Sequence, residues 1–117
     1  MFQINSLIFS YIAKNDIEME NITYDVTKLS DTVEDGIRKA SFRTCPVVCS
    51  EAIYIETEGD IIRKVQYTKG CNGNTQGVSA LCVGRKVQDV IALLDGIDCK
   101  ARGTSCPDQL ARALKQL

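Results

Sequence analysis

The fold is decided by the stretch AIYIETEGDIIRKVQYT, residues 52–68. Apolar and polar side chains alternate along its first half, so Ile53 and Ile55 fall on one face of an extended chain. Residues 58–60, Glu-Gly-Asp, interrupt this alternation as a three-residue turn in which the glycine can adopt a left-handed backbone conformation. The stretch therefore predicts an antiparallel hairpin over residues 51–68.

After this hairpin the apolar residues repeat at the spacing of a helix. Residues 87–94 place valine, isoleucine and leucine at positions i, i+3, i+4 and i+7, and Gly96 stands where a helix C-terminus usually has its glycine. We expect a shorter helix before it, ending at Gly84. A last helix should start near residues 104–108, where Pro107 suits a first turn.

We therefore expect an α+β domain: a small three-stranded antiparallel sheet with helices packed on one face. All six cysteines lie in residues 45–117, which we take as the domain proper, and we expect residues 1–44 to form an N-terminal extension packed on it. The elements predicted within the extension are a helix over the apolar residues of 4–12, a short strand over 21–26, and a helix that a capping box of Asp31 and Glu34 opens and that runs to about Ala40.

Composition excludes several classes of site. The chain has 117 residues, a net charge of −1 and no histidine, so a Ser-His-Asp triad, a Cys-His pair and zinc ligation by imidazole are impossible. Any transition-metal site has to be built from cysteines, with a carboxylate at most. A pI near 5.4 and the lack of tryptophan give no strong nucleic-acid signal. No apolar run approaches the roughly 18 residues of a membrane span.

The chain carries six cysteines, a high number for its length. An even count suits three disulfides in a secreted protein. The N-terminal sequence, however, has no basic residue before its apolar stretch, which Asn5 and Ser6 interrupt, and this is unlike a signal peptide. We therefore expect a cytoplasmic protein with free thiols, in which clustered cysteines more often serve metal or redox chemistry.

Four of the thiols fall in three expected loops: Cys49 just before the hairpin, Cys71 just after it, and Cys99 and Cys106 ahead of the last helix. Loops anchored on strands and helices are where ligand sites form. Cys71 and Cys106 stand at expected helix starts, where free backbone amides and the helix dipole stabilise a thiolate. No pair has the C-x-x-C spacing of a zinc motif, so spacing alone leaves scattered buried cysteines as the alternative.

The other candidates are less distinctive. Cys82 is expected on the apolar side of a helix, where it packs as a small hydrophobe. Cys45 is open between packing and a role at the site. Glu51, two residues after Cys49, is open between a strand-edge charge and a carboxylate that binds a metal or accepts a proton.

The segments GCNGN at 70–74, GIDC at 96–99 and TSCPDQLA at 104–111 resemble the TSCPD domain family. The resemblance covers about residues 45–117. It implies that the family's four characteristic cysteines are Cys49, Cys71, Cys99 and Cys106, for which a metal-binding role is usually inferred. It also implies a relation to ribonucleotide reductase, because the family occurs both as small stand-alone bacterial proteins and as a tail on adenosylcobalamin-dependent reductases.

A more distant resemblance concerns the order of the elements, which is similar to that of U-type iron–sulfur scaffold proteins. It implies that three loop cysteines and an acidic residue converge at one end of a small sheet, here Cys49, Cys71 and Cys106 with Glu51. Cys99 departs from that pattern. A fourth thiolate would turn an open, labile site into a closed one and favours a structural metal.

Three functions remain open. The first is an accessory module that binds zinc or an iron–sulfur cluster and is related to the tail of ribonucleoside-diphosphate reductase, which is then a candidate partner. The second is an enzyme: either the reductase itself, for which 117 residues leave no room, or a thiol relay through Cys99 and Cys106. The third is an interaction domain with buried cysteines. Bound metal would support the first function, a reversible disulfide the second, and neither the third.

Overall fold

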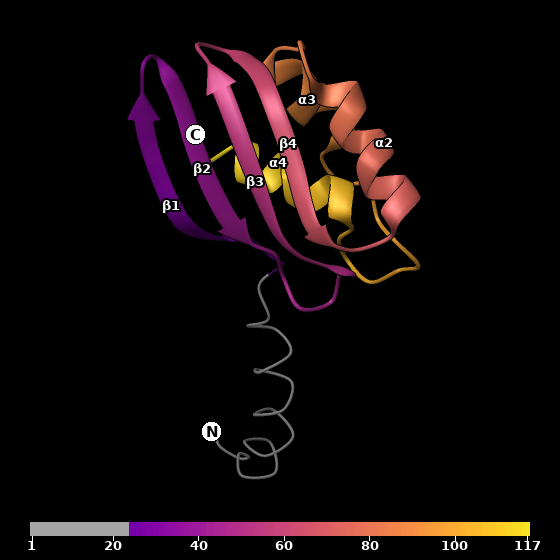
Figure 1. The fold of residues 1–117 in the computed structure, drawn as a ribbon. Coiled ribbons are helices and arrows are strands. Elements are labelled where there is room, and N and C mark those ends of the chain that lie inside the picture. The colour runs from indigo at the N-terminus through magenta and orange to yellow at the C-terminus, as the bar shows by residue number, and fades with distance from the viewer. Residues whose placement is uncertain (1–23) are drawn as a thin grey trace, which may run out of the picture.

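The computed structural model describes residues 24–117, which form one sheet with helices on one of its faces (Figure 1). The elements follow one another as β1 (Thr27–Glu34), β2 (Ile37–Arg43), β3 (Ser50–Glu58), β4 (Ile61–Lys69), α2 (Asn72–Cys82), α3 (Val87–Leu94) and α4 (Cys106–Leu114). The α+β class is as expected, but the sheet has four strands, in the order β1-β2-β3-β4, and the prediction of three strands is wrong.

The hairpin of β3 and β4 confirms the prediction made from the alternating apolar and polar side chains. Glu58 pairs with Ile61, so the connecting loop holds two residues rather than three, and Gly59 takes a positive φ of 61° in it. The register is antiparallel and pairs Ser50 with Lys69 at the open end of the hairpin. This end brings together the segments that precede β3 and follow β4.

The extra strand comes from the segment in which a helix was predicted up to Ala40. Residues 31–40 instead belong to a second hairpin, β1 and β2, which turns at Asp35 and Gly36. Both turn residues have positive φ, 53° and 82°, and the pair Asp-Gly is a preferred sequence for such a two-residue hairpin turn. The Asp-x-x-Glu pattern that resembled a helix cap therefore lies along a strand, and the turn chemistry decides the structure.

The core lies between the sheet and the helices. The sheet contributes mainly buried side chains of β2, β3 and β4: Ala40, Phe42, Ile53, Ile55, Ile62 and Val65. The helices contribute Cys82 of α2, Val90 of α3, and Leu110, Ala113 and Leu114 of α4. Each large apolar side chain buried in this way contributes roughly 1.5–3 kcal/mol to folding. Edge strand β1 adds little to this core, since nearly all its residues are exposed.

The three helices expected after the hairpin are present. α3 ends before Gly96, which has a positive φ of 85°. α4 begins with Cys106 and Pro107, and the Ser105 hydroxyl caps it by accepting a hydrogen bond from the Asp108 amide. The helix predicted over residues 4–12 lies outside the described residues, as does the start of the strand predicted over 21–26, of which residues 24–26 are not a strand.

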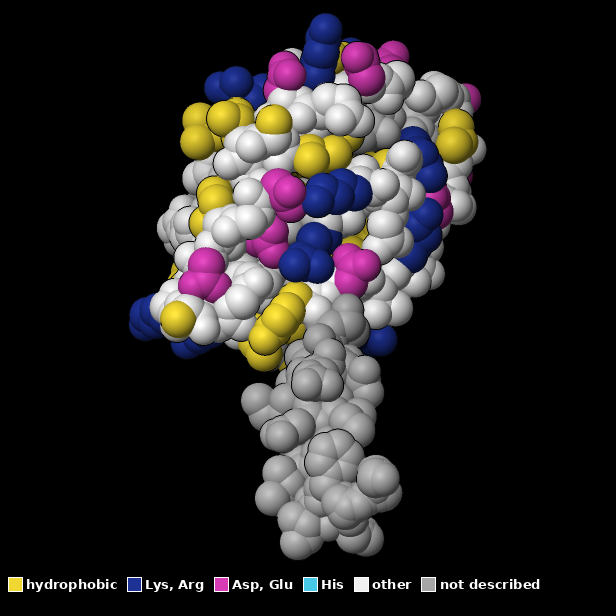
Figure 2. All heavy atoms as spheres, turned by 180° about the vertical axis from the view of Figure 1, so that it is seen from behind, with side chains coloured by type: hydrophobic (Ala, Val, Ile, Leu, Met, Phe, Trp, Pro, Cys, Tyr) yellow, Lys and Arg dark blue, Asp and Glu magenta, His cyan; other side chains and the backbone are white. Residues whose placement is uncertain are grey.

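Charges of both signs are interspersed on the face opposite to that of Figure 1 (Figure 2). Ion pairs within the described residues include Arg112 with Asp108 and Lys115 with Asp95. Among residues 24–117, no helix is long and apolar enough to cross a membrane.

Candidate thiol site

Three loops meet at the end of the sheet where β3 begins and β4 ends, which is the lower end in Figure 1. There the four cysteines of the family pattern line one cavity of about 60 Å³: Cys49, Cys71, Cys99 and Cys106. Val47, Val48 and Arg102 also contribute to its wall. A water-sized guest needs about 10–15 Å³ of such volume, so the cavity has room for a small ion or group.

Cys49 and Cys71 extend from two paired strand ends. They flank the register pair of Ser50 and Lys69, which explains why residues so far apart in sequence come together. The Sγ atoms of Cys49 and Cys71 lie 4.0 Å apart, and both residues are exposed. The hydrogen bond from the Cys71 thiol to the Cys49 sulfur raises the pKa of Cys71 above its ordinary value, and repulsion between two negative sulfurs adds to this effect.

Cys106 is the buried member of the set. Its Sγ lies 3.2 Å from the Ser50 hydroxyl, and its carbonyl accepts a hydrogen bond of 2.9 Å from Tyr67. As the first residue of α4 it lies at the positive end of the helix dipole, and Cys71 at the N-cap of α2 has the same advantage. Both helix starts were predicted from the sequence.

Cys99 is half-buried and lies in the loop between α3 and α4. Its amide donates to the Thr104 carbonyl at 3.2 Å, which folds the loop back toward the start of α4. The Arg102 guanidinium of the same loop donates to the Val47 carbonyl at 3.4 Å and so joins this loop to the one that carries Cys49.

The remaining candidate residues do not line the cavity. Cys82 is 3% exposed and belongs to the apolar core, as predicted, and burial raises the pKa of its thiol. Glu51 does not line the cavity; its carboxylate lies 3.3 Å from the Lys69 ammonium on the surface. Cys45 is buried, and its backbone amide helps to anchor the loop that leads to Cys49, as described below.

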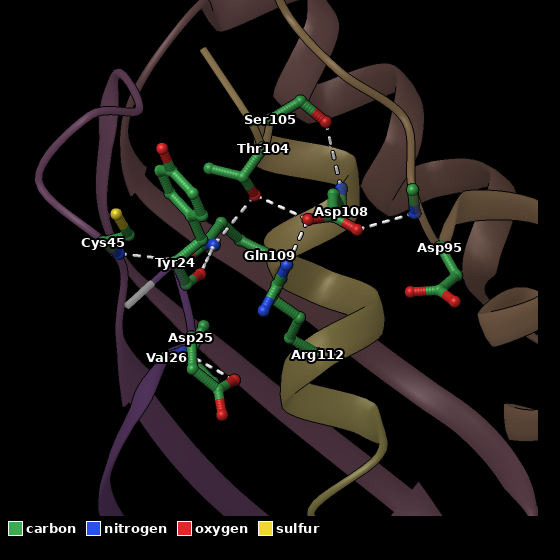
Figure 3. A network of polar contacts seen from close by, with 12 residues as sticks. Tyr24, Asp25, Val26, Cys45, Asp95, Thr104, Ser105, Asp108, Gln109 and Arg112 are labelled. Carbon is green, nitrogen blue, oxygen red and sulfur yellow. Dashed lines mark hydrogen bonds and ion pairs between the residues drawn. The ribbon is translucent and has the colours of Figure 1, made fainter. Parts of the chain in front are cut away.

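A buried polar network holds the loops in place (Figure 3). At its centre Asp108, only 2% exposed, accepts hydrogen bonds from the Gly96 amide at 2.7 Å, the Thr104 hydroxyl at 2.6 Å and the Arg112 guanidinium at 2.9 Å. Burial opposes the ionisation of this carboxyl group, but the three donors outweigh burial and hold the pKa of Asp108 below its ordinary value. Asp108 thereby fixes both ends of the loop that carries Cys99.

Gln109 makes the second connection. Its side-chain oxygen accepts a hydrogen bond of 2.8 Å from the Cys45 amide, which anchors the loop leading to Cys49. Its side-chain nitrogen donates to the Tyr24 carbonyl and to the Thr104 hydroxyl. Gln109 is fully buried, so each of these bonds replaces one that water would otherwise supply.

Two glycines permit close approaches at the site. Gly70, directly before Cys71, has a φ of 106°, and a side chain there would come within 3.1 Å of Thr75 and 3.2 Å of Ser50. Gly103 has a φ of 97°, and a methyl group there would lie 2.7 Å from the ring of Tyr24. Only glycine fits both the backbone conformation and the space at these positions.

Sequence reasoning did not single out Asp108 and Gln109, although both lie in the TSCPDQLA segment. An acidic residue in the first turn of a helix is usually exposed and interacts favourably with the helix dipole. A buried carboxylate at this position is therefore not expected from the sequence. The only available signal was Ser105 three residues before Asp108, which marks the capped turn in which the carboxylate is held.

The donor set suits a soft metal, since four thiols surround the cavity. Two sulfurs bonded to one zinc ion at about 2.3 Å lie roughly 3.8 Å apart, close to the 4.0 Å between Cys49 and Cys71. As the side chains lie, no three Cys, Asp or Glu residues within 24–117 already form a group that could hold a metal ion. Binding of an ion by all four thiols therefore requires them to turn further into the cavity.

Comparison with known proteins gives one match. The TSCPD domain family matches residues 22–117, which extends the resemblance expected for residues 45–117 over β1 and β2. No curated protein and no solved structure matches the chain. Since the match covers most of the sequence and includes the four cysteines of the cavity, the chain belongs to the TSCPD domain family.

Proposed function

We propose that this protein is a metal-binding accessory module whose ligands are Cys49, Cys71, Cys99 and Cys106. One observation carries the proposal: thiols from three separate loops line a single small cavity. Scattered cysteines that merely fill the core would not converge in this way, and Cys82 shows what such a residue looks like, since it is buried among apolar side chains.

The chemistry of the four residues supports a closed site. Two of the thiols stand at helix starts, and Arg102 adds a positive charge to the cavity wall, and this positive potential would offset part of the repulsion between thiolates gathered around a metal. A tetrahedral set of four sulfurs suits zinc or an iron–sulfur cluster. When bound, such a metal would join the loops and add its binding free energy to the stability of the fold.

Glu51 remains the reserve ligand of this proposal. Its carboxylate is 61% exposed and already paired with Lys69, so it would have to leave Lys69 in order to bind the metal. Exposed ion pairs of this kind contribute about 0–1 kcal/mol, so the pairing is a weak obstacle.

We further propose that the module serves deoxyribonucleotide synthesis, as a partner of ribonucleotide reductase in the cytoplasm. The support is the family resemblance, which joins the same domain to reductases as their tail. A thiol-redox role toward the reductase is the second candidate, and the 4.0 Å contact of Cys49 and Cys71 favours it specifically.

Elemental analysis of protein purified without oxygen tests the metal proposal. We expect about one zinc ion, or the iron and sulfide of one cluster, per chain. Cys71→Ser and Cys106→Ser should each lose most of this metal and unfold at a lower temperature, because the ion no longer joins the loops. Cys82→Ser is the matched control: it should lower the unfolding temperature through poorer packing while the metal content stays unchanged.

Two results together would overturn the proposal. The protein from this purification would be soluble but free of metal, and its unfolding temperature would not change after addition of zinc or reconstitution with iron and sulfide. Equal loss of metal in Cys82→Ser and Cys71→Ser would also contradict it, since metal content would then follow stability rather than the identity of the ligand.

A further inference from the structure

We propose that Cys49 and Cys71 form a reversible disulfide that closes the thiol site to metal. The disulfide itself follows from the geometry of the pair, and only its effect on metal content rests on the function proposed above. The sequence suggested Cys99 and Cys106 as the redox-active pair, and this proposal gives that role to Cys49 and Cys71 instead.

The contact between the two sulfurs places the pair within reach of a disulfide. Cys49 directly precedes Ser50, and Cys71 follows Lys69 after Gly70, while Ser50 and Lys69 are paired residues of neighbouring antiparallel strands. The sulfurs stand 4.0 Å apart, so they must approach by about 2 Å to reach the S–S bond length of about 2.05 Å. Rotation of two exposed side chains can supply such a movement.

Accessibility separates this pair from the other two thiols. Cys49 and Cys71 are exposed, whereas Cys106 is buried and Cys99 half-buried. Cys106 is in addition engaged with the Ser50 hydroxyl, and Cys99 belongs to a loop that Asp108 holds through the Gly96 amide. An oxidant in solution therefore reaches Cys49 and Cys71 first.

The oxidation balances with a peroxide as the oxidant. The thiolate of one cysteine attacks a peroxide oxygen, the O–O bond breaks, and a sulfenic acid and one water form after proton transfer. The second thiol attacks the sulfenic sulfur, the S–O bond breaks, and the hydroxyl leaves as a second water. Two thiols and one hydrogen peroxide thus become one disulfide and two waters. A dithiol reductant returns both sulfurs to thiols by exchange and takes the disulfide itself.

The consequence for the site is the loss of two of its four thiols. A disulfide sulfur no longer carries the negative charge of a thiolate, which is the form that binds metal. The oxidised chain keeps only Cys99 and Cys106 at the cavity, and two thiolates are fewer than the four ligands of a structural zinc site.

The test uses full-length protein stripped of metal with a chelator and treated with hydrogen peroxide. Free thiols are then alkylated, the protein is digested with trypsin, and cross-linked peptides are sequenced by tandem mass spectrometry. Fragment-ion sequencing is needed because trypsin leaves Cys45 with Cys49 and Cys71 with Cys82 on shared peptides. We expect the major cross-link between Cys49 and Cys71, and its disappearance after addition of dithiothreitol.

The variants give a matched comparison. Cys71→Ser should abolish the cross-link, whereas Cys99→Ser should retain it at the level of the unchanged protein. A major cross-link between Cys99 and Cys106, or oxidation of Cys49 to sulfinic acid without any cross-link, would overturn the proposal. So would a Cys49–Cys71 cross-link that forms only in urea, because it would then not depend on the fold.

A second readout addresses the metal. Protein with zinc bound is treated with peroxide in the presence of a zinc-sensitive dye, and we expect release of most of the zinc in parallel with the cross-link. A cross-link without release of bound zinc would contradict the closing of the site. Protein that binds no metal at all would refute the proposed function alone, since the cross-link in the metal-free chain is measured independently.

Discussion

Asp108 shows how much of the site depends on a single side chain. Its carboxylate is buried and receives three hydrogen bonds, two of them from the two ends of the loop that carries Cys99. Removing an acceptor of this kind leaves donors unsatisfied in the interior, which costs more than the net contribution of the bonds themselves. Asp108 is therefore a positioning residue for the thiol site.

We expect Asp108→Asn to lower the free energy of unfolding by about 1–3 kcal/mol at pH 7, because an amide cannot accept from all three donors and loses the ion pair with Arg112. Urea unfolding followed by circular dichroism measures this change. Asp95→Asn is the control, since its surface pair with Lys115 should contribute less than about 1 kcal/mol. Equal losses of unfolding free energy in the two variants would show that the buried hydrogen bonds of Asp108 contribute no more than the surface ion pair of Asp95.

At the scale of elements, the hairpin of β1 and β2 is the part that sequence reasoning failed to predict. The alternation in residues 52–68 was long and regular, and it predicted the other hairpin correctly. β1 has no such pattern, because both of its faces are largely exposed and neither requires apolar residues. The Asp35-Gly36 turn was the one local signal, and it competed with an apparent helix cap.

The edge hairpin is held in part by an ion pair. Asp31 of β1 accepts two hydrogen bonds from the Arg38 guanidinium, at 2.8 and 2.6 Å, and one from Lys28 at 2.7 Å. These partners hold the pKa of Asp31 well below its ordinary value. A carboxyl group with a lowered pKa in the folded state stabilises the fold above its unfolded pKa of about 3.9, and this contribution is lost as the pH falls through the lower folded value.

We expect Asp31→Asn to lower the free energy of unfolding by about 1 kcal/mol at pH 7, because the bidentate pair with Arg38 is lost. Since protonation removes the same interaction from the unchanged protein, the difference between the two proteins should shrink in the most acidic buffers in which both fold. Thermal unfolding at pH 7, 5 and 3 measures this dependence. A difference that stays constant across the series would argue against the ion pair as its cause.

At the scale of the whole molecule, the thiol site is small and the larger hollows lie elsewhere. Two grooves of about 450 and 610 Å³ have no cysteine in their walls, whereas the cavity with four cysteines measures about 60 Å³. A nucleotide is much larger than the few water molecules that such a cavity can hold. The thiol cavity is therefore too small to enclose a nucleotide.

We accordingly expect no ribonucleotide reduction by the isolated chain, even with adenosylcobalamin and a dithiol present. Radical chemistry requires a shielded site that excludes water from reactive intermediates, and exposed thiols such as Cys49 and Cys71 offer no such shielding. Chromatography of anaerobic reaction mixtures for deoxynucleotides measures the activity. Product that increases in proportion to the concentration of the chain would refute the accessory role.

Spacing along the sequence could not predict that the four cysteines converge, whereas the resemblance to iron–sulfur scaffold proteins implied it for Cys49, Cys71 and Cys106, together with Glu51, which does not line the cavity. Cys49 and Cys71 meet because Ser50 pairs with Lys69, and that register follows from the turn at residues 59–60, far along the chain from either thiol. Cys99 and Cys106 join them because Asp108 and Gln109 are buried, which depends on how α4 packs. Resemblance to a family supplied what spacing along the chain could not, since distances in space are set by tertiary contacts.

The strand order β1-β2-β3-β4 has a consequence for how the chain assembles. Every strand pairs with its neighbour in sequence, so the sheet can grow by zipping up local hairpins at small entropic cost. The cavity instead joins residues as distant as Cys49 and Cys106, and beside it the Cys106 thiol contacts the Ser50 hydroxyl, 56 positions away. We expect it to close last, when α4 docks. A newly made chain would then bring Cys49 and Cys71 together early, with the hairpin of β3 and β4, and would add Cys99 and Cys106 to them only when folding is nearly complete.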